Sequence, residues 1–328
     1  MSRLVRVPCP LCANEATFLP LRNTDVDVHI AKYGELYAGE PKSRWVACGR
    51  CGFVHQNPRP TVDDLNAFYS RGEYHTEIPS SWRDPALYAR FAESYYGPKV
   101  DHAIRASGLS TGSVFEVGAG HGGSLQVFRK RGWRVVGVEP DPTLQAFAVE
   151  VAGVETVRRG LLDRETRVAE QVDLVYSNHT FEHVADLASL MAGIRTILKP
   201  GGIVFTAVPT YYRNRSRMSL LWMNSAHYSL FTHASLDQLL ARHDLEEVAH
   251  TYRGWRQEVD DLWHVSRFTG RAPAPETFYE DARAVARYVN LLNPVNTAVH
   301  APFLLARRLA RRVGGALKRR TLALVRGS

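Results

Sequence analysis

The centre of the sequence contains a glycine-rich segment that could bind a nucleotide. A β-branched and aromatic run, Val114 to Val117, ends in Gly118-Ala119-Gly120-His121-Gly122-Gly123. Glycines in such a turn adopt positive φ angles and let the backbone approach a ligand closely. A helix that begins near Ser124 would point its unpaired N–H groups at negative charge. Because G-x-G-x-x-G is also the dinucleotide fingerprint, the glycines alone do not separate a nicotinamide cofactor from another adenosyl cofactor.

Two acidic residues stand beside this segment at positions where they could hold a cofactor. Glu116 precedes the first glycine by two residues, and Glu139 ends the apolar run that begins at Val135. A carboxylate at the end of the second strand, about 20 residues past the loop, can accept both hydroxyls of an adenosine ribose. These acids favour an adenosine-containing ligand.

Three histidines follow two later predicted strands, where a substrate could lie. His179 and His183 come after the strand Asp173 to Asn178, and His227 comes after the strand Ile203 to Val208. Histidine is the usual group that takes a proton from an alcohol near neutral pH, contributing on the order of a hundred- to ten-thousandfold in rate. His227 could be a base, a substrate contact or an ordinary loop histidine. His183 either lines the pocket or makes a structural hydrogen bond, and His179 is expected to line the pocket.

The four cysteines form two C-x-x-C pairs near the N-terminus: Cys9, Cys12, Cys48 and Cys51. Each pair places two thiolates on one tight turn, and two pairs complete a tetrahedron around zinc. Four thiolates leave no open position for water, so the ion would be structural. Disulfides and a redox role are the alternatives, and a reducing compartment disfavours the first. The 35 residues between the pairs are expected to form a hairpin or loop of their own.

Several elements must position these groups. A proline-punctuated linker runs from His55 to Pro60, and Thr61 to Asp64 form a capping box that opens a helix through Leu65 and Phe68. A second helix is expected at about 85–107, and the loop between the two helices contains Tyr74 and could cover a substrate. A further helix ends at the turn Leu198 to Gly202, ahead of the fifth strand.

In combination, the acid–glycine loop, the strand-two acid and the "L-K-P-G-G" turn resemble the class I S-adenosylmethionine-dependent methyltransferases, over roughly 103–267. The resemblance implies a Rossmann-like α/β fold with S-adenosylmethionine as cofactor. Its glycine loop would approach the methionine part, its strand-two acid the ribose, and Gly160 to Asp163 would frame the adenine. The implied cofactor-binding residues are Glu116, Gly118, Ala119, Gly120, Glu139, Pro140, Gly160, Leu161, Asn178 and His179.

The whole layout, with the cysteine pairs, the "N-P-R-P-T" linker and the tyrosine loop, resembles the zinc-ribbon methyltransferases of sugar and natural-product biosynthesis. Those enzymes carry a Tyr-His-Glu-His motif after strand five, of which this chain keeps only the last histidine, His227; Asn224 and Ala226 replace the tyrosine and the glutamate. The resemblance implies His227 as base and Tyr74 as a tyrosine that faces the substrate, with His183 nearby. The altered motif, and the short segment after the last predicted strand, favour O-methylation slightly over C-methylation of a small molecule or saccharide.

Two other functions compete with this interpretation. Ribosomal-RNA guanine methyltransferases also join a zinc module to this catalytic fold, but they use three cysteines and a histidine, and this chain has no basic stripe with interleaved aromatics for RNA. The third hypothesis is a protein that binds the cofactor without catalysis, and it predicts cofactor uptake with no methyl acceptor.

The charge of the chain is concentrated at its C-terminus. The net charge is +8, yet residues 1–281 carry 31 basic and 33 acidic side chains, so ten basic residues after Asp281 supply the excess. Leu305, Leu309 and Val313 form a helical stripe within 302–326. Such a basic helix could pack on the protein, lie on an anionic membrane, or hold nucleic acid.

Four segments are therefore predicted: a zinc module at 1–60, a helical linker and substrate cover at 61–102, a seven-stranded, mostly parallel methyltransferase sheet at 103–270, and a helical basic tail at 271–328. No apolar run approaches the roughly 20 residues of a membrane span, and no signal peptide is recognised. The expected location is the cytoplasm, with the inner face of the membrane as an option through the tail. The acceptor is expected under Tyr74 and an aromatic cover that includes Tyr211, Tyr212, Trp222, Tyr228 and Phe231.

Overall fold

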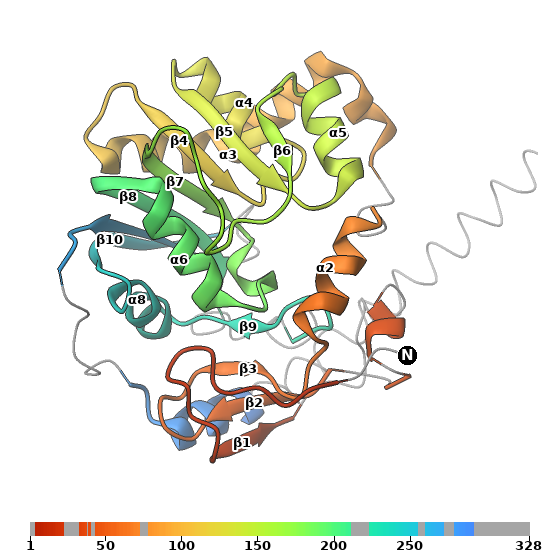
Figure 1. Ribbon diagram of the computed structural model, residues 1–328, viewed down its shortest axis with the longest axis vertical. Helices are drawn as coiled ribbons and strands as arrows, with labels where there is room; N and C mark the ends of the chain where they lie inside the picture. The colour runs from red at the N-terminus through yellow and green to blue at the C-terminus, as the bar shows by residue number, and fades with distance from the viewer. Residues whose placement is uncertain are drawn as a thin grey trace, which may run out of the picture.

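A computed structural model describes residues 4–22, 33–37, 39–40, 43–72, 78–210, 223–254, 260–271 and 279–291. Its largest feature is a seven-stranded sheet in the order β10-β11-β8-β7-β4-β5-β6 (Figure 1). The strands are β4 (Ser113–Val117), β5 (Arg134–Glu139), β6 (Val157–Arg159), β7 (Val172–Asn178), β8 (Leu198–Pro209), β10 (Leu245–Gly254) and β11 (Asp260–Phe268).

The direction of the strands follows the pattern predicted for the sheet. β6, β5, β4, β7 and β8 are parallel to one another, whereas β11 is antiparallel to both β8 and β10. Every residue of β4 is buried, as expected for a central parallel strand that is covered on both faces. The predicted α/β fold with a seven-stranded, mostly parallel sheet is confirmed.

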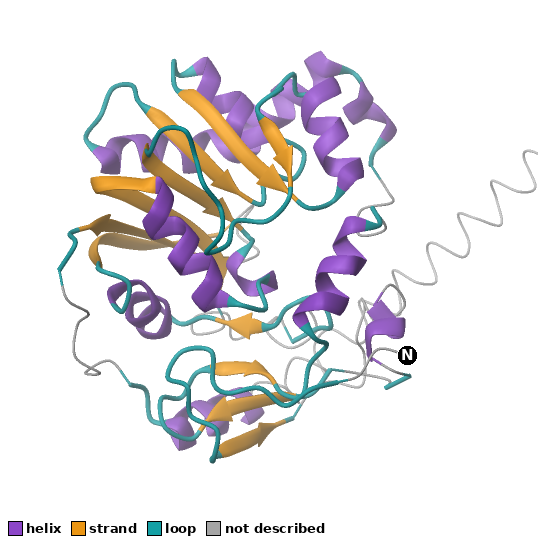
Figure 2. Ribbon diagram, viewed as in Figure 1, coloured by secondary structure: helices purple, strands orange, loops and turns teal. Residues whose placement is uncertain are grey.

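Helices cover both faces of this sheet (Figure 2). One core joins α3 (Pro85–Ser107), α4 (Gly123–Lys130) and α5 (Pro142–Glu150) to one face, and another joins α6 (Leu187–Ile197) and α8 (His233–Ala241) to the other. The predicted limits of α3 agree with its caps. The side chain of Asp84 accepts hydrogen bonds from two N–H groups of the first turn, and Gly108 ends the helix at a φ of 74°.

A second, four-stranded sheet lies beside the first and takes strands from two distant parts of the chain. Its order is β1 (Phe18–Leu21), β2 (Trp45–Cys48), β3 (Val54–Gln56) and β9 (Ser229–Leu230), all antiparallel. The helical residues 282–291 pack on it through Val285, Ala286 and Val289. The helix α2 (Val62–Ser70) then leads toward the large sheet, with Thr61 accepting from Asp64 N–H as its cap.

One local prediction is wrong. The strand expected at Ile203 begins at Leu198 as β8, because Leu198 already pairs with Val172. The lysine–proline–glycine segment is therefore part of β8, at the point where the register between β7 and β8 shifts. His183 ends a separate 3-10 turn, η3 (Phe181–His183), between β7 and α6, and Asp186 caps α6.

Within the described residues, no helix is long and apolar enough to cross a membrane. The basic segment 302–326 and the loop that contains Tyr74 lie outside the described residues.

Candidate functional site

The glycine loop forms the turn between β4 and α4. Gly118, Gly120 and Gly122 have φ angles of 69°, 51° and 74°, which side chains other than glycine rarely adopt. A Cβ at Gly118 would lie 2.5 Å from the Oγ1 of Thr180, so that glycine allows close packing. A Cβ at Gly120 would meet nothing within 4 Å. The loop is thus open at Gly120, where a ligand could approach the backbone.

Glu139 connects the loop to the end of β5. Its two carboxylate oxygens accept hydrogen bonds from Gly120 N–H at 2.8 Å and Asp141 N–H at 3.0 Å. Burial outweighs these two bonds and raises the pKa of Glu139 to about 7. The backbone of Gly160 donates to the Glu139 carbonyl, and Leu161 beside it is exposed. The predicted ribose and adenine contacts therefore lie at one edge of the sheet, with Pro140 between the acid and α5.

Glu116 lies deeper than its neighbours. Its side chain is buried and accepts a hydrogen bond from the Ser124 hydroxyl in the first turn of α4, and burial raises its pKa well above the usual value. Its other oxygen has no hydrogen-bond partner among the described residues. Its predicted contact with a cofactor stays a prediction, as does that of Ala119.

We expect cofactor affinity to depend on the ionisation of Glu139. Ribose hydroxyls donate to the ionised carboxylate, so raising the pH through the pKa of about 7 increases the binding-competent fraction. Affinity for S-adenosylhomocysteine should fall about tenfold between pH 8 and pH 6, since each pH unit below a pKa removes about tenfold of the ionised form. Isothermal titration calorimetry measures it. Glu139→Ala should weaken binding at least about tenfold, whereas Glu150→Ala at the exposed end of α5 should not; equal affinity in Glu139→Ala would contradict this.

A chain of alternating charges runs past the ends of β7 and β11. Lys99 of α3 donates to Asn178 Oδ1 at 2.6 Å and pairs with Asp261 Oδ2 at 3.1 Å. The same Asp261 oxygen lies 3.1 Å from His179 Nε2. Burial opposes the charge on His179, but Asp261 outweighs it and raises the pKa of His179 to about 9. The His179 ring is therefore an imidazolium at neutral pH, held by carboxylates.

The chain continues to a cluster of two further histidines. Glu182 is buried, and its Oε1 lies 3.4 Å from His179 Nδ1 and 3.9 Å from His183 Nε2. His183 Nδ1 lies 2.8 Å from the Ala226 carbonyl and must donate to it, and the rings of His183 and His227 meet edge to face at 4.7 Å. Burial lowers the pKa of His183 despite Glu182, so the neutral form of this ring is favoured. The structure brings both predicted catalytic histidines together.

The four-stranded sheet supports the segment that carries His227. The Nε2 of Gln56 at the end of β3 donates to the carbonyls of Asn224 and His227. The Tyr37 hydroxyl lies 2.6 Å from Gln56 Oε1 and 2.8 Å from the Ser225 carbonyl, and its one proton is shared between these two acceptors. Beyond His227, Tyr228 N–H donates to the Glu182 carbonyl at 2.7 Å. The cysteine-containing module thus positions the histidine cluster.

The predicted aromatic cover is partly wrong. Tyr228 and Phe231 are fully buried: Tyr228 packs among the residues next to α2, and Phe231 packs on Phe53 with ring centroids 5.5 Å apart. Both rings serve the contact between the two sheets and are not part of a substrate cover. Tyr74, Tyr211, Tyr212 and Trp222 lie outside the described residues.

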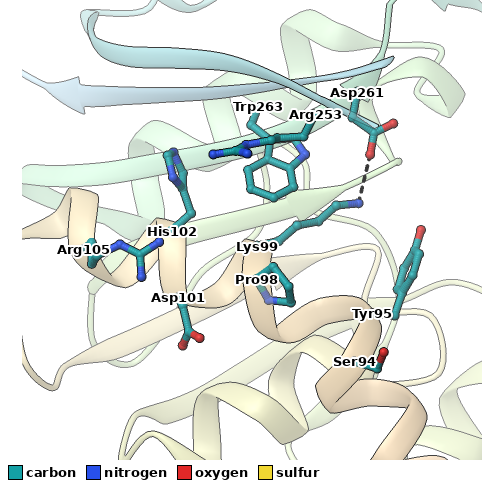
Figure 3. Close-up of a pocket in the computed structure, with 10 residues that line it drawn as sticks. All are labelled: Ser94, Tyr95, Pro98, Lys99, Asp101, His102, Arg105, Arg253, Asp261 and Trp263. Atoms are coloured by element: carbon teal, nitrogen blue, oxygen red, sulfur yellow. Dashed lines mark ion pairs between the residues drawn. The ribbon is translucent and has the colours of Figure 1, made fainter. Parts of the chain in front are cut away.

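A cavity of about 390 Å³ opens on the α3 side of the charge chain (Figure 3). Lys99 and Asp261 form its inner end, and His102 and Trp263 line its wall, with ring centroids 5.5 Å apart. Sequence reasoning missed Lys99 and Asp261, because their partners come from three separate elements. The only signal in the sequence was an acidic residue, Asp261, at the start of the last strand, which lies next to the end of the fifth strand.

The four cysteines converge in the N-terminal module. All are buried and none forms a disulfide, and their sulfur atoms lie within 4.8 Å of one another. Cys9 Sγ lies 3.6 Å from Cys51 Sγ, and Cys12 Sγ lies 3.5 Å from Cys48 Sγ. A tetrahedron with zinc–sulfur bonds of about 2.3 Å has edges of about 3.8 Å. Hydrogen bonds among the thiols and burial raise the pKa of Cys9, so four thiolates require a cation between them, and the donor set fits zinc.

Comparisons with known proteins identify a methyltransferase domain in the chain. Residues 88–250 match the family model described as a methyltransferase domain. The chain is 32% identical over 157 residues to the C-methyltransferase NovU of Streptomyces niveus, covering 45% of this chain and 36% of that protein. It is 29% identical over 188 residues to a trans-aconitate 2-methyltransferase of Acidovorax, covering 56% and 71%. The chain thus spans about a third of the length of the first relative.

Among solved structures, a Burkholderia thailandensis 1,6-didemethyltoxoflavin-N1-methyltransferase is similar at 20% identity and a TM-score of 0.45, over 63% of this chain and 86% of that one. The family match covers most of the large sheet, and the strand order of that sheet is mostly parallel. The chain contains a methyltransferase domain of the class I, S-adenosylmethionine-dependent type.

Proposed function

We propose that the protein transfers the methyl group of S-adenosylmethionine to an oxygen atom of a small, hydroxyl-bearing acceptor, such as a sugar or a related natural product. The observation that carries the proposal is the cluster of the buried Glu182 and His227 with the partly buried His183. It connects to the glycine loop through Thr180, whose hydroxyl donates to the Val117 carbonyl at 3.1 Å. A proton acceptor thus stands close to the predicted cofactor site.

The bound cofactor supplies an electrophilic methyl group on a positively charged sulfur, which leaves as a neutral thioether. The protein has to bind the cofactor and the acceptor, orient them toward each other and exclude water. Gly118 and Gly120 would hold the methionine part, and Glu139 the ribose. The loop, Thr180 and the histidine cluster would then hold the acceptor hydroxyl in line with the methyl group.

The proton of the acceptor hydroxyl goes to a histidine of the cluster. The new O–C bond forms as the C–S bond breaks, and the proton moves to the ring nitrogen of His227, with the neutral His183 beside it as a substrate contact. Glu182 stabilises the imidazolium that results, because its carboxylate lies between the histidines and in low dielectric. His179, already charged, neutralises the other side of Glu182 and keeps it ionised.

We also propose that the four cysteines hold a structural zinc ion. The sulfur separations and the buried, reduced state of the four residues support it. With four thiolates bound, no position remains for water, so the ion holds the two knuckles of the module together and takes no part in methyl transfer.

Transfer to carbon is the second candidate, and the similarity to a C-methyltransferase favours it. A carbon acceptor next to a carbonyl group also needs a base, which the same histidines would supply. The two reactions differ only in the atom that attacks the methyl group.

Mass spectrometry of acceptor pools incubated with methyl-labelled cofactor tests both candidates. We expect a labelled small-molecule product, and nuclear magnetic resonance of the purified product then distinguishes a methyl ether from a C-methyl group. Cofactor binding without a product in any sugar, natural-product or RNA pool would support a non-catalytic protein, and a labelled RNA product would support the RNA methyltransferase hypothesis.

A further inference from the structure

A second cluster of histidine and carboxylate groups lies away from the methyltransferase site, between α8 and the strand pair β10–β11. His233 begins α8, Glu247 belongs to β10 and His264 to β11. One donor atom from each of these residues lies within 4.8 Å of the other two. Residues 261, 263 and 265 of β11 face α3, so His264 points to the opposite face, toward α8.

His264 is the buried centre of this cluster. Its side chain is 0% exposed, and its Nε2 makes no hydrogen bond to a described residue although carboxylates surround it. Asp237 Oδ1 lies 3.5 Å away and Glu247 Oε2 lies 3.7 Å away. Ser266 Oγ lies 3.1 Å from His264 Nδ1 and can accept its proton, and in that tautomer Nε2 can coordinate a cation. A cation between these atoms would satisfy the nitrogen and both oxygens.

An irregularity in β10 brings the carboxylate to this face. Glu247 and His250 are three residues apart, and an ordinary strand would place them on opposite faces of the sheet. The register between β10 and β11 shifts between Glu247 and Ala249, and the extra residue puts both side chains on one face. His250 pairs with His264 across the strands, and its Nδ1 lies 2.6 Å from Glu247 Oε1.

The separations around His264 Nε2 match those between the ligands of a small divalent ion, whereas His233 and Glu247 lie at the shorter distance of a hydrogen bond. His233 Nε2 lies 2.7 Å from Glu247 Oε2, and the two contacts of His264 Nε2 are longer. Bonds of about 2.1 Å in a tetrahedron give ligand separations of about 3.4 Å. Two imidazoles with carboxylates suit zinc and similar transition ions better than calcium or magnesium, which prefer oxygen ligands alone.

We propose that His233, Glu247 and His264 bind a divalent transition-metal ion, with zinc as the foremost occupant and Asp237 beside His264 at 3.5 Å. His250 then holds the second oxygen of Glu247, and Ser266 fixes the tautomer of His264, as outer contacts commonly do at metal sites. The ion ties α8 to the antiparallel strand pair at the edge of the sheet. Since β11 also carries Asp261, the ion fixes the strand that leads to the charge chain of the methyltransferase site.

The test uses the full chain, dialysed against zinc buffered with a competing chelator near neutral pH, and counts bound zinc by mass spectrometry. The wild type should bind one zinc ion per chain more than Glu247→Gln or His264→Gln at the same free zinc. His250→Gln should keep the ion with an affinity lower by about 10- to 100-fold. His243→Gln, which changes a histidine just beyond α8 and outside the cluster, is the matched control and should keep the wild-type content.

Thermal unfolding supplies a second measurement. Zinc should raise the melting temperature of the wild type and of His243→Gln by more than that of Glu247→Gln, whose side chain is partly exposed and whose replacement leaves the core intact. The contribution of the cysteine-bound ion is common to these three proteins and cancels in the comparison. Equal zinc content and equal zinc-induced shifts in the wild type and Glu247→Gln would overturn the proposal.

Discussion

Replacing His227 with alanine is expected to lower turnover at least roughly a hundredfold, the lower end for loss of a general base. His227 lies against His183, and Glu182 lies close enough to stabilise the protonated ring. Removal of the imidazole therefore leaves no base to accept the proton of the acceptor. Affinity for S-adenosylhomocysteine should stay close to that of the wild type, because the predicted cofactor contacts belong to the glycine loop and Glu139. Single-turnover transfer of a labelled methyl group measures the first quantity, and calorimetry the second.

The control for this prediction is a pair of further variants. His183→Ala should lower turnover less than His227→Ala if His227 takes the proton, and the reverse order would transfer that role to His183. Glu182→Gln should cost less in the His227→Ala background than in the wild type, since the carboxylate acts through the charged ring. Near-normal turnover of His227→Ala would show that His227 is not the base.

The parts of the site that share a local sequence pattern could be predicted. The glycine loop, Glu139 and the strand that precedes the histidines each depend on residues within a short stretch, where turn geometry and apolar runs specify the structure. Glu139 bonds to Gly120 across a span of 19 residues, and the strand–loop–helix order fixes that distance. The cysteine pairs carry their own spacing and were found in the same way.

The parts that depend on tertiary packing could not be predicted. Strand β9 has two residues and no periodicity, yet it completes the N-terminal sheet by pairing with β3. Lys99 looks like any lysine of an amphipathic helix until Asp261, 162 residues away in the chain, is brought against it. The shift in β10 that turns Glu247 toward His264 is likewise invisible in the sequence, because one inserted residue changes no composition.

The pairing of β3 with β9 leads to the second large effect: loss of the cysteine-bound ion should lower methyl transfer at least roughly a hundredfold while cofactor binding survives. Structural zinc contributes on the order of 10 kcal/mol or more to the folding of small modules, so Cys48→Ser or a strong chelator should unfold the N-terminal sheet. Gln56 and Tyr37 then no longer hold the carbonyls of residues 224–227. His227 loses its fixed position relative to Glu182.

Gln56→Ala separates this positioning effect from unfolding of the module. It removes the hydrogen bonds to the Asn224 and His227 carbonyls but leaves all four cysteines in place. We expect turnover to fall about tenfold, since a small misplacement of a catalytic group costs up to about a hundredfold. Zinc content and affinity for S-adenosylhomocysteine should stay near wild type in Gln56→Ala, whereas Cys48→Ser should lose zinc. If zinc-free protein with a melted N-terminal sheet retained full turnover, the module would have no part in holding the base, and the histidine cluster would be ordered by the large sheet alone.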